Sequence, residues 1–318
     1  MTADRVLLAK ARRELEEDAA AHRKRRAQLR RRLYEEEPRL SALDAKIRTV
    51  FLDALVSPET MEDASSESLA LQRERASLLR ALGAPPEILE DEPLCPVCKD
   101  GGYADGEPCA CLLERYHALQ MDALSATLDV RNHTFAGFNA KLYSDAFDPE
   151  INGSPRRNIE DIRELCQIYC ADFESKFENL LFSGEPGTGK TYLAACVAGA
   201  VSKHGYSVVY GAAAHHLGQA EALHFGRGDS ETEFYVKRLT ECDLLIIDDL
   251  GAEFVTPFTQ SALLDMVNTR VMRQKKMLLC TNLTKDKMTG RYSPALVSRL
   301  EGEFLRLDFV GEDLRQKL

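Results

Sequence analysis

Residues 179–191 read Asn-Leu-Leu-Phe-Ser-Gly-Glu-Pro-Gly-Thr-Gly-Lys-Thr. An apolar run that ends at Ser183 leads into the pattern Gly-x-x-x-x-Gly-Lys-Thr, and a helical pattern follows from Tyr192. A strand, a glycine-rich loop and a helix in this order form a phosphate-binding loop, because backbone N–H groups surround phosphate oxygens and the helix N-terminus carries partial positive charge. The stretch therefore predicts a nucleoside triphosphate site.

The predicted phosphate loop consists of eight consecutive residues: Gly184, Glu185, Pro186, Gly187, Thr188, Gly189, Lys190 and Thr191. We expect Lys190 to reach the β- and γ-phosphates of ATP and the Thr191 hydroxyl to ligate Mg²⁺. A glycine-rich turn that precedes a helix by chance is the alternative. The complete motif, in register with a strand and a helix, argues against it.

A second apolar run, Leu244-Leu-Ile-Ile247, ends in two carboxylates, Asp248 and Asp249. A buried parallel strand presents such side chains at its carboxyl end, beside the phosphates. We expect Asp248 to hold Mg²⁺, directly or through water, and Asp249 to orient and activate the attacking water. The sequence thus predicts an α/β fold in which helices flank a parallel sheet and ATP is hydrolysed at the sheet's edge.

Two polar side chains further along the chain extend the predicted catalytic set. Asn282 follows the strand pattern at 277–280, and its amide is suited to position the lytic water. Arg299 ends a helical pattern, and an arginine there is suited to stabilise charge on the γ-phosphate of a neighbouring subunit. A surface arginine is the alternative that the spacing leaves open, and Arg270 is a second candidate for acting across the subunit interface.

Aromatic residues precede the ATPase core at Phe135, Phe138, Tyr143 and Phe147. They are candidates to border the adenine, and ordinary core packing is the alternative. The sequence favours core packing for each one taken singly.

Four of the nine cysteines lie close together, at Cys95, Cys98, Cys109 and Cys111. The dipeptide Asp105-Gly106 between the two pairs favours a two-residue hairpin turn, which would bring the pairs opposite each other. Four converging thiolates fit a closed structural Zn²⁺ site. Since the second pair has the spacing Cys-x-Cys, an iron–sulfur cluster remains the alternative.

The chain before the cysteines is expected to be helical, because residues 4–33 contain neither Gly nor Pro and are rich in helix-forming residues. Seven of the ten residues from 23 to 32 are basic, but acidic neighbours favour a solvated helix face over a nucleic-acid contact. Helical patterns continue to residue 84, and a partner-binding arm and a self-packed bundle are equally open. We divide the chain into a helical partner-binding arm (1–92), a four-cysteine zinc knuckle with a linker helix (93–130) and an ATPase domain (131–318).

The composition limits the partners. The net charge of −10 argues against general binding to polyanions, so a nucleic-acid contact requires a local patch, with Lys237, Arg238 and the basic arm as candidates. No apolar run approaches the roughly 20 residues that span a membrane, and the N-terminus lacks an apolar signal core. We therefore expect a cytoplasmic protein without a membrane partner.

The order of these motifs resembles the AAA+ ATPases of the DnaC/DnaI type, the replicative helicase loaders of the IstB-like ATP-binding superfamily. The resemblance covers about residues 130–318 and rests on five segments: 184–191, 245–253, 281–283, 298–300 and 311–315. The cysteine cluster and helical arm also look like the N-terminal region of the Gram-positive members. The resemblance implies the following roles: Walker A at Lys190 and Thr191, Walker B at Asp248 and Asp249, sensor 1 at Asn282, an arginine finger at Arg299 and sensor 2 at Arg315.

What the resemblance implies is a Mg²⁺-dependent ATPase that loads the replicative hexameric helicase onto single-stranded DNA and assembles into a homo-oligomer on ATP and DNA. Only 19 residues follow Arg299, so the expected core lacks the full C-terminal lid of most AAA+ proteins. A transposition regulator of the IstB type, acting on duplex DNA, shares this core, although the cysteine cluster argues against it. A small-molecule kinase and a non-hydrolysing adaptor are weaker alternatives.

Overall fold

The computed structural model of the protein describes residues 5–56, 61–90, 92–125, 128, 130–149 and 151–316. Contacts within the chain divide these residues into two compact units. The smaller unit comprises residues 12–112, and the larger unit comprises residues 5–11 and 113–316. Each unit is described by itself.

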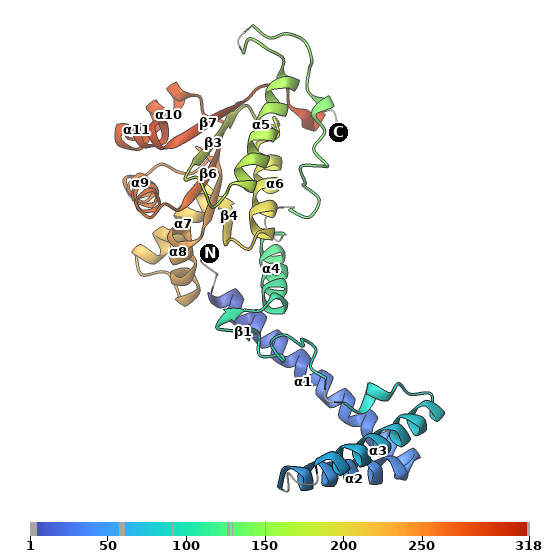
Figure 1. Ribbon diagram of the computed structural model, residues 1–318. Helices are drawn as coiled ribbons and strands as arrows, with labels where there is room; N and C mark the ends of the chain where they lie inside the picture. The colour runs from blue at the N-terminus through green and yellow to red at the C-terminus, as the bar shows by residue number, and fades with distance from the viewer. Residues whose placement is uncertain are drawn as a thin grey trace. The chain divides into compact units, whose positions relative to one another are not determined.

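The larger unit is built on a five-stranded sheet in which all paired strands run parallel (Figure 1). The strand order is β4-β5-β6-β3-β7. The strands are β3 (Asn179–Gly184), β4 (Val208–Ala212), β5 (Leu244–Leu250), β6 (Lys276–Thr281) and β7 (Phe304–Phe309). The predicted parallel α/β sheet is confirmed.

Helices cover both faces of this sheet (Figure 1). One face carries α5 (Pro155–Ala171) and α6 (Lys190–Lys203). The other face carries α7 (Ala213–His224), α8 (Ser230–Glu241), α9 (Pro257–Met272), α10 (Lys285–Arg291) and α11 (Pro294–Glu303). Two separate apolar layers therefore enclose the sheet.

The second layer explains the continuous apolar run in β5. Leu244 and Ile246 pack into the layer under α5 and α6, whereas Leu245 and Ile247 pack into the layer under the other helices. Because successive side chains of a strand point to opposite faces, a strand that is buried on both faces needs apolar residues at every position. The apolar run ends at Ile247, and the next residue, Asp248, lies near the carboxyl end of the strand.

The smaller unit holds most of α1 (Arg5–Glu36), together with α2 (Pro38–Val56), α3 (Met61–Ala81) and the short helix η2 (Pro86–Leu89). Proline begins α2, a position that does not need a backbone N–H. A small buried cluster joins these helices through Leu33, Leu40, Leu79 and Leu89. The arm is therefore at least partly packed against itself.

Part of the basic run in α1 has a structural use. A guanidinium N–H of Arg26 donates to the carbonyl of Ile88 at 3.2 Å, and Arg30 donates to that of Leu89 at 2.8 Å. Arg31 forms an ion pair with Glu35, one turn further on, at 2.9 Å. Arg26 and Arg30 thus bind backbone carbonyls within the smaller unit, whereas the expectation was a solvated helix face.

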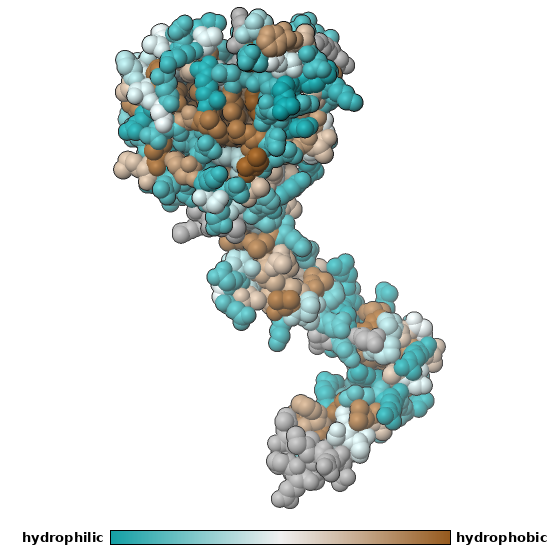
Figure 2. Space-filling view, turned by 45° about the horizontal axis from the view of Figure 1, so that its top comes forward, coloured by the Kyte–Doolittle hydropathy of each residue, from teal (hydrophilic) through white to brown (hydrophobic). Residues whose placement is uncertain are grey.

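On the face of the larger unit seen in Figure 2, apolar residues gather in the middle and hydrophilic residues frame them. α4 (Ala110–Ser125) begins within the second cysteine pair and precedes the strands of the parallel sheet in the sequence. No helix among the described residues is long and apolar enough to cross a membrane.

Candidate nucleotide site and cysteine cluster

The phosphate loop joins β3 to α6, as predicted. Gly187 and Gly189 have φ angles of +77° and +92°, a region that residues with a side chain rarely adopt. A Cβ atom on Gly189 would lie 2.4 Å from the hydroxyl oxygen of Tyr143. That hydroxyl donates to the carbonyl of Thr188 at 2.9 Å, so Tyr143 supports the loop from outside.

Lys190 lies inside the loop. Its side chain is largely buried, and its ammonium group donates to the carbonyls of Gly184 and Glu185 at 2.7 Å each. Burial lowers the pKa of Lys190, whereas nearby acidic groups, Asp248 among them, oppose that shift. A cation is thus held where phosphate oxygens would be bound.

Asp248, near the end of β5, accepts hydrogen bonds from two hydroxyl groups and a backbone N–H. The hydroxyl groups of Thr191 and Tyr210 donate to Oδ2 at 3.0 and 2.8 Å, and the backbone N–H of Asp249 donates to Oδ1 at 2.9 Å. The two side chains that the sequence predicts as Mg²⁺ ligands, Thr191 and Asp248, are therefore in direct contact. A hydroxyl and a carboxylate are the oxygen donors that Mg²⁺ prefers.

Asp249 is exposed and has a φ of +52°, at a shift in strand register after which Leu250 still pairs with Thr281 of β6. Partial desolvation and the neighbouring Asp248 carboxylate raise the pKa of Asp249, while Lys190 and Arg315 lower it. An aspartate with a raised pKa beside a phosphate loop is suited to accept a proton from water.

Asn282 and Arg299 take different positions. Asn282 follows Thr281, which pairs with Ser183 next to the phosphate loop, so it lies at the same sheet edge. Arg299 lies on α11 with nearly half of its side chain exposed, and it forms an ion pair with Glu303 at 3.1 Å. The structure thus places Asn282 at the predicted site and leaves Arg299 on the surface.

The expectation that Arg270 acts across a subunit interface is wrong. Its side chain is fully buried. Its guanidinium donates to three backbone carbonyls, those of Leu239, Cys242 and Lys276, at 2.7, 3.0 and 2.6 Å. Arg270 therefore joins the ends of α8 and β6, and its charge faces carbonyl dipoles inside the unit.

The segment after β7 folds back onto the phosphate loop. The backbone N–H of Leu314 donates to the carbonyl of Gly187 at 3.1 Å. A Cβ atom on Gly187 would lie 1.8 Å from Oδ1 of Asp313, so this carboxylate rests against the loop. Arg315 follows within the same short helix, η4 (Leu314–Gln316).

A cavity of about 410 Å³ lies beside this segment. Its walls include Tyr143, Phe147, Pro155, Val310 and Leu314. Cavities of this size accommodate small ligands. Of the aromatic candidates, Phe147 and Tyr143 thus border a cavity next to the loop, whereas Phe138 is buried in the core and Phe135 packs against it.

The four cysteines converge, and no other group of three or more possible metal ligands occurs among the described residues. Strands β1 (Tyr103–Ala104) and β2 (Glu107–Pro108) form the predicted hairpin, with positive φ at Asp105 and Gly106. The Sγ atoms of Cys95 and Cys109 lie 3.7 Å apart, those of Cys98 and Cys111 lie 3.4 Å apart, and all four lie within 4.8 Å of one another. The backbone N–H of Cys98 lowers the pKa of Cys95 to about 7.

An aromatic cluster with a cation lies at the end of α7 and the start of α9. The ring centroids of Phe225 and Phe258 are 5.6 Å apart, and those of His224 and Phe258 are 4.8 Å apart. The guanidinium of Arg227 lies over the Phe225 ring at 5.7 Å from its centroid. More than half of Phe225 is exposed. Two sequence segments separated by α8 and β5 thus build one exposed surface.

Sequence reasoning missed three of these contributors: Tyr210, Asp313 and the aromatic cluster. Tyr210 interrupts an apolar strand pattern with a polar group, which is a weak signal for a hydrogen bond to the neighbouring strand. Asp313 lies within a motif of the resemblance without a role assigned to it. The rings of Phe225 and Phe258 have no local sequence signal that joins them.

Three comparisons with known proteins bear on this site. The IstB-like ATP binding protein family matches residues 138–298, just over half of the chain. The chain is similar to the uncharacterized protein YdaV of Escherichia coli (strain K12), with 31% identity over 123 residues. It is also similar to the replicative helicase loader DnaC of the same strain, with 25% identity over 151 residues.

The matched regions are partial. They cover 38% of this chain and 48% of YdaV, and 47% of this chain and 61% of DnaC. Among solved structures, the crystal structure of the DnaC helicase loader is similar with a TM-score of 0.47 and 17% identity, over 57% of this chain and 98% of that one. The matched family region includes the phosphate loop, Asp248, Asp249 and Asn282.

Proposed function

Because this chain belongs to the IstB-like ATP-binding protein family, we propose that it is a Mg²⁺-dependent ATPase that loads the replicative hexameric helicase onto single-stranded DNA. The observation that carries the ATPase proposal is the contact between Thr191 and Asp248 at the mouth of a complete phosphate loop. The similarity to a replicative helicase loader supports the process in which the ATPase acts.

Different residues of the site bind the phosphates, hold the metal ion and activate the attacking water. Lys190 and the backbone N–H groups of 184–191 bind the phosphates, and Thr191 and Asp248 hold Mg²⁺, which neutralises charge on the β- and γ-phosphates when bound. Asp249 orients the attacking water and accepts its proton, and the amide of Asn282 fixes that water. Arg315 follows the loop-contacting Asp313 and adds positive charge near Asp249.

Arg299 completes the site of a neighbouring copy in the oligomer. Its exposure on α11 supports this role, because a buried arginine such as Arg270 has no access to a neighbour. A mixing experiment tests it. Lys190→Ala and Arg299→Ala chains should each hydrolyse ATP poorly, whereas their mixture should recover activity, since Lys190→Ala chains supply Arg299 to intact phosphate loops. A mixture as inactive as its components contradicts the role.

The aromatic cluster is the proposed contact to single-stranded DNA. Exposed rings stack on bases of any sequence, and a nearby arginine neutralises the phosphate backbone. Phe225→Ala should weaken binding of a fluorescent oligonucleotide by about tenfold, as expected for one lost base stack of about 1–3 kcal/mol. Phe177→Ala removes a partly exposed phenylalanine elsewhere and serves as the matched control.

The helical arm is the proposed helicase contact. Three large apolar side chains of α2 and α3, those of Phe51, Leu52 and Leu69, are at least half exposed. Substituting Phe51 and Leu52 by serine should abolish capture of the cognate helicase and leave oligonucleotide binding intact. Phe225→Ala should have the reverse pattern.

The cysteine cluster is proposed to hold structural Zn²⁺. Four sulfurs around one tetrahedral ion at about 2.3 Å lie about 3.8 Å apart, which agrees with the observed separations. An iron–sulfur cluster spreads its thiolates over several iron atoms and would need wider spacing. Elemental analysis of the purified chain should find one zinc, lost in Cys98→Ala and kept in Cys166→Ala; iron in its place contradicts the assignment.

One experiment separates the functions. The full chain, the cognate helicase and a single-stranded circle are combined with ATP or ADP, and helicase on the circle is measured together with phosphate release. The loader proposal requires ATP-dependent helicase loading that Lys190→Ala loses. Filaments on duplex DNA without helicase capture would instead identify a transposition regulator. A phosphorylated small molecule would identify a kinase. Unchanged behaviour of the Lys190→Ala variant would identify a non-hydrolysing adaptor.

A further inference from the structure

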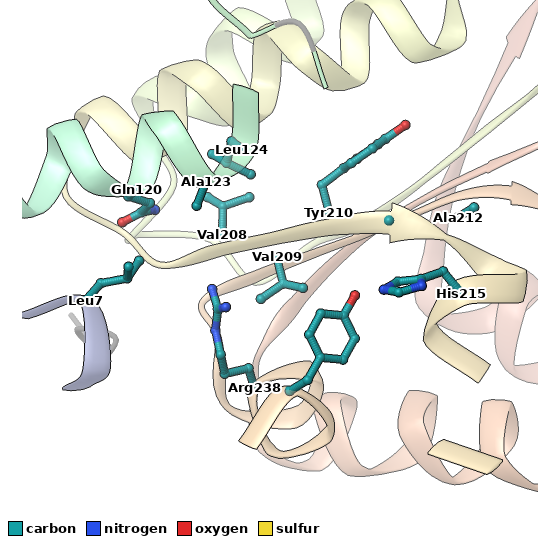
Figure 3. A pocket seen from close by; sticks show the side chains of 12 residues that line it. Leu7, Gln120, Ala123, Leu124, Val208, Val209, Tyr210, Ala212, His215 and Arg238 are labelled. Carbon is teal, nitrogen blue, oxygen red and sulfur yellow. The ribbon is translucent and has the colours of Figure 1, made fainter. Parts of the chain in front are cut away.

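β4 forms one edge of the sheet, and a cavity of about 410 Å³ lies along it. Figure 3 shows Val208 and Tyr210 pointing to one face of β4 and Val209 pointing to the other. The face of Tyr210 is the one that packs against the apolar layer under α6. The ring of Tyr210 is therefore part of the cavity wall and of the core beside the phosphate-loop helix.

The strand register explains how Tyr210 reaches the site. Tyr210 pairs with Ile246 on β5, and Ala212 pairs with Asp248. Ile246 and Asp248 are two residues apart, so they point to the same face of the sheet, which is also the face of Tyr210. The long side chain of Tyr210 extends along that face and places its hydroxyl 2.8 Å from Oδ2 of Asp248.

The donor Tyr210 belongs to β4, so it is part neither of the phosphate loop nor of the strand that carries Asp248. Thr191 belongs to the phosphate loop and is itself a proposed Mg²⁺ ligand, so its hydroxyl oxygen would be used for the metal. The third donor is the backbone N–H of Asp249 and reaches the other oxygen, Oδ1. The hydroxyl of Tyr210 remains available to fix Oδ2 throughout.

We propose that Tyr210 is a positioning residue for the metal-binding carboxylate: its hydroxyl keeps Asp248 oriented toward Thr191 when the Thr191 hydroxyl is used for Mg²⁺. Partners of this kind orient the ligands of metal sites, and their removal weakens metal binding without removing a ligand. The inference rests on the proposed ATPase function. It adds a residue that lies on the edge strand, outside every motif of the site.

Tyr210→Phe in the full chain tests it, because phenylalanine keeps the ring in the core and removes only the hydroxyl. Binding of the non-hydrolysable analogue AMP-PNP is measured in EDTA and during a Mg²⁺ titration. Affinity in EDTA should change by less than twofold. The Mg²⁺ concentration at half-maximal tightening should rise about tenfold, within the range that loss of an orienting partner produces, and kcat should fall by a similar factor.

Tyr206→Phe is the matched control, since the hydroxyl of Tyr206 also donates to a carboxylate, that of Glu174, at 3.3 Å. It should leave the Mg²⁺ midpoint unchanged. An unchanged midpoint in Tyr210→Phe, or an equal shift in both variants, overturns the inference. Thermal unfolding of each variant sets a temperature at which all are folded. Failure of the proposed function gives a different result, namely AMP-PNP binding by Lys190→Ala that equals that of the unsubstituted chain.

Discussion

Protonation of His216 should destabilise the larger unit at mildly acidic pH. His216 is fully buried on α7, between the Ile246 carbonyl at 3.3 Å from Nε2 and the Tyr235 hydroxyl at 2.9 Å from Nδ1. A neutral ring satisfies both contacts when Nε2–H donates to Ile246 and Nδ1 accepts from Tyr235. Protonation of Nδ1 removes that acceptor and buries a charge, and burial accordingly lowers the pKa of His216 to about 4.

The sign and size of the effect follow from the two pKa values. The unfolded chain has a histidine pKa of about 6.5 and binds the proton more strongly than the folded chain. The free energy of unfolding therefore decreases as the pH falls below about 6.5 and levels off below about 4. The His216 contribution is about 2 kcal/mol at pH 5 and about 3 kcal/mol at the limit.

Urea unfolding of the full chain at pH 7.5 and pH 5.0, followed by circular dichroism, measures this contribution. His216→Gln replaces the ring by a neutral side chain, so the variant should lose about 2 kcal/mol less stability than the unsubstituted chain over this interval. His204→Gln removes an exposed histidine and should follow the unsubstituted chain. If His216→Gln shows the same dependence on pH as the unsubstituted chain, the reasoning is refuted.

Three further substitutions test other contacts. Arg270→Leu leaves three buried carbonyls without their donor and should reduce the free energy of unfolding by about 3 kcal/mol, measured by urea titration. Tyr143→Phe removes the hydrogen bond to Thr188 and should weaken ATP binding about fivefold in a titration, corresponding to about 1 kcal/mol. Asp313→Asn removes a negative charge from the phosphate loop and should tighten ATP binding about threefold, as expected for like charges roughly 6 Å apart in water.

Features that are determined by a short stretch of sequence were predicted correctly. The run Leu244–Ile247 indicated a strand buried on both faces, because two apolar layers demand apolar residues at every position. The phosphate loop and the turn at Asp105-Gly106 were equally local, since their positive φ angles require particular residue types. These features gave the parallel sheet, the position of the nucleotide site and the approach of the four cysteines.

Whether an arginine can contact a neighbouring copy depends on whether its side chain is buried, and the spacing of residues in the sequence did not reveal that. Arg270 and Arg299 were both candidates for acting across a subunit interface. The fold turns Arg270 inward, where three carbonyls surround it, and leaves Arg299 at the surface. A helical pattern predicts which face a residue shares with its neighbours, but it does not show that the last carbonyls of another helix, here that of Leu239 in α8, lie within reach. An arginine that lies close to such carbonyls satisfies them and loses its access to a neighbouring copy.

The remaining contributors depend on the order of the strands. Because β3 lies between β6 and β7, the ends of both neighbouring strands flank the phosphate loop, which brings Asn282 and the segment of Asp313 to the same edge. Because β4 pairs with β5, Tyr210 reaches Asp248 through a register that no spacing within either strand encodes. The motif residues mark where the proposed hydrolysis takes place. The residues that hold those motifs in place become visible only when the strand order is known, so the variants that best separate positioning from catalysis are found outside the motifs.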